Sequence, residues 1–249
     1  MDMEFSGKVA LVTGAAKNIG RSIAMQLAAG GAAVGVNTLS SKADAEKVVK
    51  EIRDSGGKAE LFMADIADAA QVQGMVEGAV KAFGRLDMLV LNASYRKETL
   101  FVDMTFEEWR RVMSITLDGS FHCIKASLPH LIKAGGGSIV TLGGDSALSG
   151  AVGKVNSSAG KNGLVGMTRA LAKELAQYGI RVNCVSPGPI DTSRPGYRAA
   201  TKPIEGRVPL GRKGDPDEIA ATVRFVCGAG GGFITGQTIH VNGGTLMSS

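Results

Sequence analysis

Short apolar runs rich in β-branched residues alternate with amphipathic stretches along most of the 249-residue chain. In the amphipathic stretches apolar residues recur at the spacing of helical turns, as Ile23, Leu27 and Ala28 do, which predicts helices. Alternating buried strands and helices are typical of βαβ units, in which helices cover both faces of a parallel sheet. The seven expected strands cover residues 9–12, 32–36, 59–63, 86–91, 138–142, 181–185 and 237–241.

The pattern continues without an internal repeat or an obvious linker, so we expect a single domain over residues 1–249. Its fold class is α/β: a Rossmann-type, doubly wound, seven-stranded parallel sheet with helices on both faces. The long irregular stretch is residues 187–215, which is rich in Gly, Pro and basic residues. A loop beyond about 15 residues inside a compact domain is usually functional, so this segment predicts a lid over a site.

Composition excludes several other classes. The hydrophobic content of 44% argues against disorder and places the 35 glycines inside a folded domain. No apolar run approaches about 18 residues, and the start MDMEFSGKVA is acidic where a secretion signal carries basic residues. We therefore expect a cytoplasmic protein that makes no contact with membranes.

The net charge of +5 and the three cysteines change the picture little. Lys and Arg are scattered rather than interleaved with aromatics, so a pocket for an anionic cofactor fits them better than nucleic acid does. Cys123, Cys184 and Cys227 are far apart and show no CxxC spacing or nearby histidine. Neither a disulfide framework nor a metal site is expected.

The segment after the first strand, residues 13–20, has the composition of a phosphate-binding turn. Gly14 permits a tight turn, and Gly20 allows the following helix to pack closely on the strand. The start of that helix presents free N–H groups and a positive dipole end to phosphates. A purely structural turn is the alternative. The cofactor contacts expected here are Gly14, Lys17, Asn18, Ile19 and Gly20.

Together with four further motifs, this turn resembles the short-chain dehydrogenase/reductase family over about residues 7–244. Asn18 replaces the middle glycine of the family's commoner Gly-x-x-x-Gly-x-Gly turn. The motif Thr235 to Gly244 is similar to the family's last strand. The resemblance implies further cofactor contacts after the third, fourth and sixth strands: Asp65 and Ile66, then Asn92, Ala93 and Ser94, then Pro187, Gly188, Ile190 and Thr192.

The end of the second strand indicates which nicotinamide cofactor is bound. An NAD enzyme usually places an acidic residue there to accept the ribose 2′-hydroxyl, and none is present in residues 37–42. In the family, members that prefer NADP often have a basic residue at the position of Lys17, and Asn37, Ser40 and Ser41 offer further polar contacts. We therefore favour NADP(H) over NAD(H). The alternative is that Lys17 and Lys42 are solvated surface charges.

The resemblance also implies the chemistry, which is hydride transfer between nicotinamide and a carbonyl or alcohol carbon. The family uses a tyrosine as acid or base, a lysine four residues later, a serine thirteen residues earlier and an asparagine on an earlier helix. Residues 161–175 match the family's long helix without a gap, so Lys161 takes the lysine position. Counting back places Ser157 at the tyrosine and Gly144 at the serine, and Thr116 stands at the asparagine.

These replacements make the family's usual mechanism improbable. Losing a positioned general acid costs about 10²–10⁴ in rate, and serine does not ionise near neutral pH. Ser146 is the best substitute for the missing serine. The catalytic candidates are thus Lys161, Ser157, Ser146 and Thr116.

Three hypotheses remain open. The first is an NADP(H)-dependent oxidoreductase whose proton comes from water, from Tyr95 or from the substrate itself. The second is an inactive subunit or cofactor-binding partner of an active sister chain, and the third is a non-redox lyase or hydratase with Lys161 as base. The resemblance implies a tetramer, of one chain or of two related ones.

The substrate would be a small molecule. The lid segment carries many more basic side chains than acidic ones, which favours an anionic substrate; a solvated basic loop is the alternative. The basic residues are Arg194, Arg198, Lys202, Arg207, Arg212 and Lys213, against Glu205.

Overall fold

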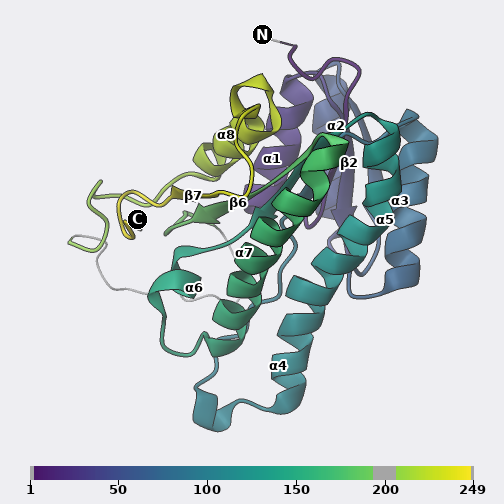
Figure 1. The fold of residues 1–249 in the computed structure, drawn as a ribbon. Helices are drawn as coiled ribbons and strands as arrows, with labels where there is room; N and C mark the ends of the chain where they lie inside the picture. Colours follow the sequence, from purple (N-terminus) through teal and green to yellow (C-terminus); the bar gives the residue numbers. More distant parts are fainter. Residues whose placement is uncertain (1–2, 193–205, 248–249) are drawn as a thin grey trace.

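A computed structural model describes residues 3–192 and 206–247 of the chain. Its centre is a seven-stranded sheet in the order β3-β2-β1-β4-β5-β6-β7, with every neighbouring pair parallel (Figure 1). The predicted α/β doubly wound fold is confirmed. The strands are β1 (Val9–Val12), β2 (Ala33–Thr38), β3 (Lys58–Met63), β4 (Met88–Leu91), β5 (Gly137–Leu142), β6 (Ile180–Pro187) and β7 (Thr238–Val241).

All seven predicted strands are present, and the differences lie at their ends. The fourth begins at Met88 rather than at 86, although Leu86 is fully buried beneath it. The sixth runs on to Pro187, because Ser186 and Pro187 still pair with β7. The apolar runs in the sequence therefore predicted the buried core, whereas the hydrogen bonds between neighbouring strands determine where each strand ends.

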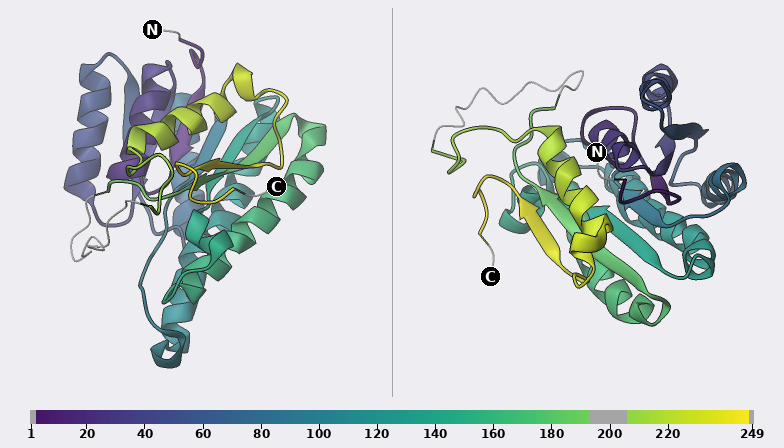
Figure 2. Two further views of the ribbon diagram at one scale, coloured as in Figure 1. Left: turned by 90° about the vertical axis from the view of Figure 1, so that its left-hand side faces the viewer. Right: turned by 90° about the horizontal axis from the view of Figure 1, so that it is seen from above.

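Helices cover both faces of the sheet, as Figure 2 shows from two further directions. One apolar cluster joins α1, α2 and α8 to the sheet, and the other joins α3, α5 and α7 to its opposite face. Among the described residues, no helix is long and apolar enough to cross a membrane. The helices are α1 (Asn18–Ala29), α2 (Lys42–Asp54), α3 (Ala69–Phe83), α4 (Phe106–Met113), α5 (Gly119–Lys133), α6 (Asp145–Ser149), α7 (Val155–Leu175) and α8 (Pro216–Cys227).

The burial pattern explains why the strands are short and apolar throughout. In β1, Ala10 and Val12 face the first cluster while Val9 and Leu11 face the second, and all four are buried. A strand covered on both faces has no solvent side, so its sequence does not alternate between apolar and polar residues. Because β1 lies between β2 and β4, the loops that follow β1 and β4 diverge to opposite sides and leave a crevice between them.

The predicted lid is partly described. Ile190 forms an isolated bridge with Gly214, and the N–H of Asp191 donates to the Gly214 carbonyl at 2.8 Å. The two ends of the segment thus lie side by side. Arg194, Arg198, Lys202 and Glu205 of this prediction fall outside the described residues.

The described end of the lid is fixed to α8. Asp215 caps the helix, accepting from the N–H of Asp217 at 2.8 Å, and Glu218 accepts in return from the N–H of Asp215 at 2.7 Å. Hydrogen bonds from the Arg212 guanidinium, the shorter at 2.6 Å, lower the pKa of Glu218 to about 2. Glu218 therefore stays ionised through the neutral range and holds Arg212 in place.

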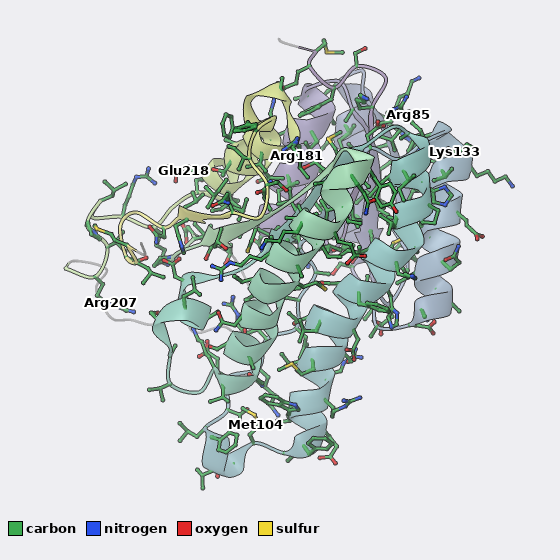
Figure 3. The ribbon with its side chains drawn as sticks, in the orientation of Figure 1. Arg85, Met104, Lys133, Arg181, Arg207 and Glu218 are labelled. Atoms are coloured by element: carbon green, nitrogen blue, oxygen red, sulfur yellow. The ribbon has the colours of Figure 1, made fainter. Side chains whose placement is uncertain are left out.

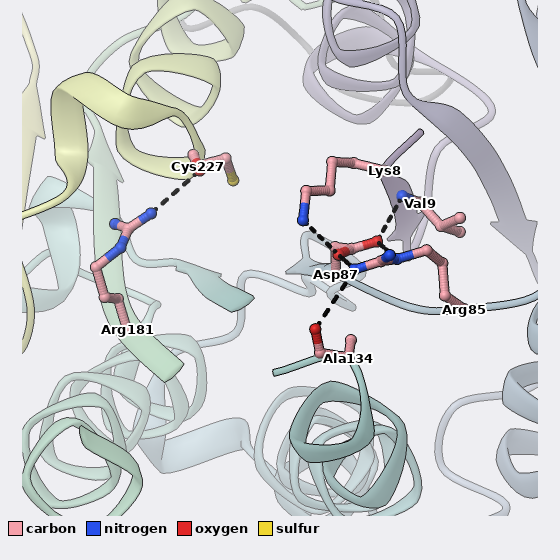
Figure 4. Close-up of polar contacts among 7 residues, drawn as sticks. All are labelled: Lys8, Val9, Arg85, Asp87, Ala134, Arg181 and Cys227. Atoms are coloured by element: carbon pink, nitrogen blue, oxygen red, sulfur yellow. Dashed lines mark hydrogen bonds and ion pairs between the residues drawn. The ribbon is translucent and has the colours of Figure 1, made fainter. Parts of the chain in front are cut away.

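At the amino-terminal ends of the strands, Asp87 is buried and accepts hydrogen bonds from three residues (Figure 4). Its carboxylate accepts from the Val9 N–H at 3.0 Å, from Lys8 at 3.1 Å and from Arg85 at 2.6 and 2.8 Å. Arg181 lies at the same ends of the strands, and its guanidinium donates to the Val226 and Cys227 carbonyls at the end of α8 and to the Gly231 carbonyl in the turn that follows. These contacts lie at the opposite ends of the strands from the site described below.

We predict that Asp87→Ala lowers the free energy of unfolding by about 2–3 kcal/mol, because it leaves a buried N–H and a guanidinium without their acceptor. Urea denaturation followed by circular dichroism measures this. Lys8→Ala is the control; because the Lys8 side chain is half exposed, it should cost less than about 1 kcal/mol. Equal losses in the two variants would contradict this view of Asp87.

Candidate active site

A cavity of about 1060 Å³ opens at the carboxyl ends of the strands, where the loops after β1, β2, β4, β5 and β6 meet. This is the crevice at which open parallel sheets bind their ligands. A volume of this size belongs to the upper range of ligand pockets, which fits a large ligand such as a dinucleotide. The cavity is therefore the candidate site.

The turn after β1 approaches its neighbours so closely that side chains are excluded. Gly14 has a φ of +61°, and a Cβ there would lie 2.9 Å from the Cα of Ala93. A Cβ on Gly20 would lie 2.3 Å from the Gly14 carbonyl oxygen and 2.5 Å from the Asn92 amide nitrogen. Both glycines are thus required by close backbone approach, as the sequence predicted.

Asn18 departs from the glycine of the commoner turn, and the structure explains why asparagine fits. Within the described part of the chain it is the one non-glycine residue with a positive φ, at 50°. Asparagine tolerates this left-handed conformation better than other side chains. The turn therefore keeps its shape, and α1 begins at Asn18 with its first N–H groups at the cavity wall.

Thr13 and Asn92 join the ends of β1 and β4. The Thr13 hydroxyl oxygen accepts from the N–H groups of Asn92 and Ala93 at 3.0 and 3.1 Å. The Asn92 amide donates to the Thr13 and Gly14 carbonyls at 3.0 and 2.9 Å. The side chain of Asn92 thus positions the turn, and it lines the cavity together with Ala93 and Ser94.

The end of β2 carries polar but uncharged side chains. The buried Asn37 amide accepts from the Gly14 N–H at 3.3 Å and donates to the Phe62 and Ala64 carbonyls. Lys17 reaches this wall from the turn and pairs with Asp44 of α2 at 3.0 Å. Residues 37–40 contribute no carboxylate to the cavity.

Lys161 occupies the floor of the cavity on α7. It is only 9% exposed, and its ammonium group donates to the Leu142 and Gly143 carbonyls at 2.8 and 2.6 Å. Leu142 is the last residue of β5, and Gly143 follows it. Helix α7 thus places a buried ammonium group at the carboxyl end of β5, where the loop with Gly143 and Gly144 begins.

Ser157 and Thr116 are buried but do not line the cavity. Ser157 is 8% exposed, and its N–H donates to the Asn156 side-chain oxygen at 2.6 Å. Thr116 is buried in a π-helical turn, η2 (Ser114–Asp118), and a Cβ on Gly160 would lie 3.2 Å from its side chain. Single π-turns inside helices are common near functional sites.

Gly143 and Gly144 are adjacent but differ in what they exclude. A Cβ on Gly143 would lie 2.9 Å from the Cys184 sulfur, so a side chain there must displace that thiol. At Gly144 the backbone is extended, and the nearest atom to a Cβ would be the Lys161 Cδ at an ordinary 3.5 Å. The fold therefore does not require the absence of a side chain at position 144.

Asp145 follows Gly144 and links this loop to the end of the described chain. Its carboxylate accepts from the Thr245 hydroxyl, and the Ser186 hydroxyl and the His240 ring nitrogen each approach it at 3.5 Å. Asp145 and Thr245 both line the cavity. This pair was not predicted from the sequence, because 100 positions separate its members.

The cysteines lie outside the cavity wall. Burial raises the pKa of Cys123 to about 12 and that of Cys227 to about 11, and it also raises the pKa of Cys184. All three are free thiols. They therefore stay protonated near neutral pH and supply no thiolate.

Most of the site residues predicted from the sequence meet in this one cavity. Ser41, Thr116 and Ser157 do not line it; Ser41 precedes α2, where its N–H faces the Thr38 hydroxyl. Arg96 and Thr245 line the cavity although no motif in the sequence pointed to either. The predicted residues that do line it are Gly14, Lys17, Asn18, Ile19, Gly20, Asn37, Ser40, Asp65, Ile66, Asn92, Ala93, Ser94, Ser146, Lys161, Pro187, Gly188, Ile190 and Thr192.

Comparison with known proteins identifies the family. A family profile described as enoyl-(acyl carrier protein) reductase matches residues 14–245. The 3-oxoacyl-[acyl-carrier-protein] reductase FabG of Staphylococcus aureus is 41% identical over 242 residues, which cover 96% of this chain and 98% of that protein. FabG of Thermotoga maritima is 36% identical over 247 residues, covering 98% and 100%.

Solved structures agree with the sequence matches. A short-chain dehydrogenase from Burkholderia cenocepacia in complex with NADP gives a TM-score of 0.92 at 34% identity, covering 97% of this chain and 99% of that one. A dehydrogenase/reductase from Sinorhizobium meliloti gives 0.93 at 33% identity, covering 99% and 98%. The chain therefore belongs to the short-chain dehydrogenase/reductase family of nicotinamide-dependent oxidoreductases, which confirms the resemblance seen in the motifs.

We predict opposite outcomes for alanine at the two adjacent glycines. Gly143→Ala should lower the free energy of unfolding by about 1–3 kcal/mol, because its Cβ must displace the Cys184 side chain. Gly144→Ala should change it by less than about 1 kcal/mol, because the new methyl group meets Lys161 at van der Waals distance. Thermal and urea denaturation of both variants, compared with the native chain, decide the matter. A large loss in Gly144→Ala would mean that the fold itself requires glycine there.

Proposed function

We propose that this chain is an NADP(H)-binding oxidoreductase that acts on a carbonyl or secondary alcohol. One observation carries the proposal: a single cavity joins the glycine turn at one end to Lys161 at the other. The first suits the phosphates of a dinucleotide, and the second suits the ribose and the reacting end in this family. The relatives named as reductases, and the neighbour bound to NADP, support it.

The residues present fit the cofactor. The close approach at Gly14 and Gly20 places the start of α1 at the cavity wall with no side chain at either glycine, and a pyrophosphate would bind there. Asn92 to Ser94 and the turn from Pro187 to Thr192 would hold the nicotinamide half, and Asp65 and Ile66 the adenine. A bound nicotinamide supplies a hydride to, or accepts one from, the substrate carbon.

NADP(H) is preferred over NAD(H) in this proposal because of the charges at the end of β2. No carboxylate from residues 37–40 lines the cavity to repel a 2′-phosphate, and Ser40 and Lys17 offer donors. The ion pair between Lys17 and Asp44 opposes this preference, since Asp44 competes for the ammonium group. The net preference thus depends on a balance between two exposed side chains.

The chain's own residues would contribute positioning more than proton transfer. Lys161 holds a positive charge on the floor, which favours negative charge on a substrate oxygen above it. Ser146 lines the cavity beside Gly144 and is the serine best placed to donate to that oxygen. Because Ser157 and Thr116 do not line the cavity and serine is a poor acid, the proton would come from water, from Tyr95 or from the substrate. Turnover would therefore be slow.

A second candidate is an inactive or weakly active subunit that pairs with an active sister chain. It is favoured by Gly144, because the fold tolerates a side chain there yet none is present. Exposed aromatic side chains offer contact surface for the proposed homotetramer or heterotetramer: Phe106 of α4 and Phe121 of α5, with Phe225 of α8 and Phe233 farther along the chain. A lyase or hydratase that uses Lys161 as base has no comparable support.

We predict that the protein binds NADPH more tightly than NADH, and that two substitutions move this preference in opposite directions. Lys17→Ala should weaken NADPH binding by about tenfold and leave NADH unchanged, because it removes a partner of the 2′-phosphate. Asp44→Asn should strengthen NADPH binding by freeing Lys17. Titration of the cofactor's fluorescence measures both. Lys50→Ala, at an exposed ion pair elsewhere on α2, is the control. Equal binding of NADH and NADPH would contradict the assignment.

We also predict that restoring the family's side chains restores its acid. The triple variant Thr116→Asn, Gly144→Ser and Ser157→Tyr should raise ketone-dependent NADPH oxidation by about 10²-fold or more, because it returns a positioned general acid and a hydrogen-bond donor. Absorbance at the NADPH band against a panel of ketones measures the gain. Lys161→Ala in the triple variant should abolish it. If the triple variant folds and binds NADPH without any gain, the replaced positions are not what limits the reaction.

A further inference from the structure

The cavity wall carries more positive charge than its neighbouring acids balance. Four of its cations have carboxylate partners, and Lys161 bonds to backbone carbonyls as described. The four pairs are Lys17 with Asp44 at 3.0 Å, Lys154 with Glu98 at 3.2 Å, Lys213 with Asp191 at 3.5 Å and Arg111 with Asp65 at 3.6 Å.

Two arginines of the cavity wall are left without a carboxylate partner among the described residues. Arg96 and Arg207 both line the cavity, and neither has an ion pair or side-chain hydrogen bond in the part of the chain that the structure describes. An arginine facing a ligand cavity without an internal partner keeps its full set of donors for that ligand. In Figure 3, Arg207 lies on the loop at the left of the view, on the other side of the molecule from Arg85.

Arg96 stands on an anchored backbone. The next residue, Lys97, pairs with Glu108 of α4, and the Thr99 N–H donates to the Gly153 carbonyl at 3.0 Å. These contacts tie the loop after β4 to the segment that leads into α7. Arg96 therefore belongs to a part of the cavity lining whose loop is tied to the segment before the helix that bears Lys161.

Arg207 lines the same cavity from the loop that precedes α8. Its neighbour Val208 is buried at 3% exposure, and the Leu210 N–H donates to the Gly243 carbonyl at 3.1 Å. Two residues beyond Gly243, Thr245 bonds to Asp145, which follows Gly144. Arg207 is thus attached, through this turn, to the wall beside Gly144.

Neither arginine serves the cofactor's phosphates in the arrangement proposed above, since those are met at the glycine turn by α1 and Lys17. We propose that Arg96 and Arg207 bind an anionic group, a carboxylate or a phosphate, on the carbonyl substrate. A guanidinium matches either group through paired N–H donors. This inference rests on the proposed function only in assigning the other end of the cavity to the cofactor. It names the substrate class as a charged carbonyl compound, in preference to a neutral ketone.

The test is equilibrium binding, so it does not depend on turnover. The full chain, with and without saturating NADP⁺, is titrated by calorimetry with two matched pairs of probes: acetoacetate against methyl acetoacetate, and dihydroxyacetone phosphate against dihydroxyacetone. At least one charged probe should bind about tenfold or more tightly than its neutral partner. The preferred pair tells a carboxylate site from a phosphate site. Raising the salt concentration should weaken only the charged probe.

Substitution then assigns the binding to the two arginines. Arg96→Gln and Arg207→Gln should each weaken the charged probe by about tenfold while leaving the neutral probe and NADP⁺ unchanged. Arg110→Gln is the matched control, because Arg110 is an exposed arginine of α4 that does not line the cavity. Circular dichroism confirms that each variant is folded.

The outcomes are distinct. Equal affinity for charged and neutral probes, no binding of either charged probe, or charged-probe binding that survives both substitutions would overturn the inference. If the protein fails to bind NADP(H) yet binds a charged probe through Arg96 and Arg207, the proposed function fails and the anion site stands. If NADP(H) binds and the charged probes do not, the anion site fails and the proposed cofactor site stands.

Discussion

The contact between the carboxyl ends of β1 and β4 determines where every other part of the site lies. Thr13 and Asn92 take part in four hydrogen bonds across this junction, two to the Thr13 hydroxyl and two from the Asn92 amide. They hold the glycine turn against β4 so tightly that Gly14 and Gly20 admit no Cβ. The start of α1 is then fixed at the mouth of the crevice. The proposed phosphate site thus depends on backbone packing between two central strands.

The reacting end of the cavity is under weaker constraint. Lys161 is fixed by the Leu142 and Gly143 carbonyls at the end of β5 and just beyond it, whereas Gly144 has an extended backbone and room for a side chain. The binding end and the reacting end can therefore change independently. Substitution of Gly144 can alter the chemistry with little effect on stability, while substitutions at Gly143 or in the glycine turn disturb the packing of the fold. Such a fold can keep the glycine turn unchanged while the residues near Lys161, and with them the reaction, change.

The elements that depend on local patterns were predicted from the sequence, and those that depend on distant contacts were missed. The buried strands and Gly14 and Gly20 follow from short-range rules, and even Asn18, an exception to the glycine pattern, obeys the same backbone requirement. The partnership of Asp145 with Thr245 was missed because nothing in either local sequence specifies it. Arg96 was missed for a related reason: an exposed arginine is ordinary until the walls around it are assembled and its neighbours' charges are seen to be balanced.

The bond between Thr245 and Asp145 has a practical consequence. It anchors Thr245 in the cavity wall, while the amino-terminal segment lies at the other ends of the strands, near the label N in Figure 1. An affinity tag fused after the last strand would pull on a residue that shapes the site, whereas a tag fused to the amino terminus would not. The position of an affinity tag therefore matters, because Thr245 contacts the site.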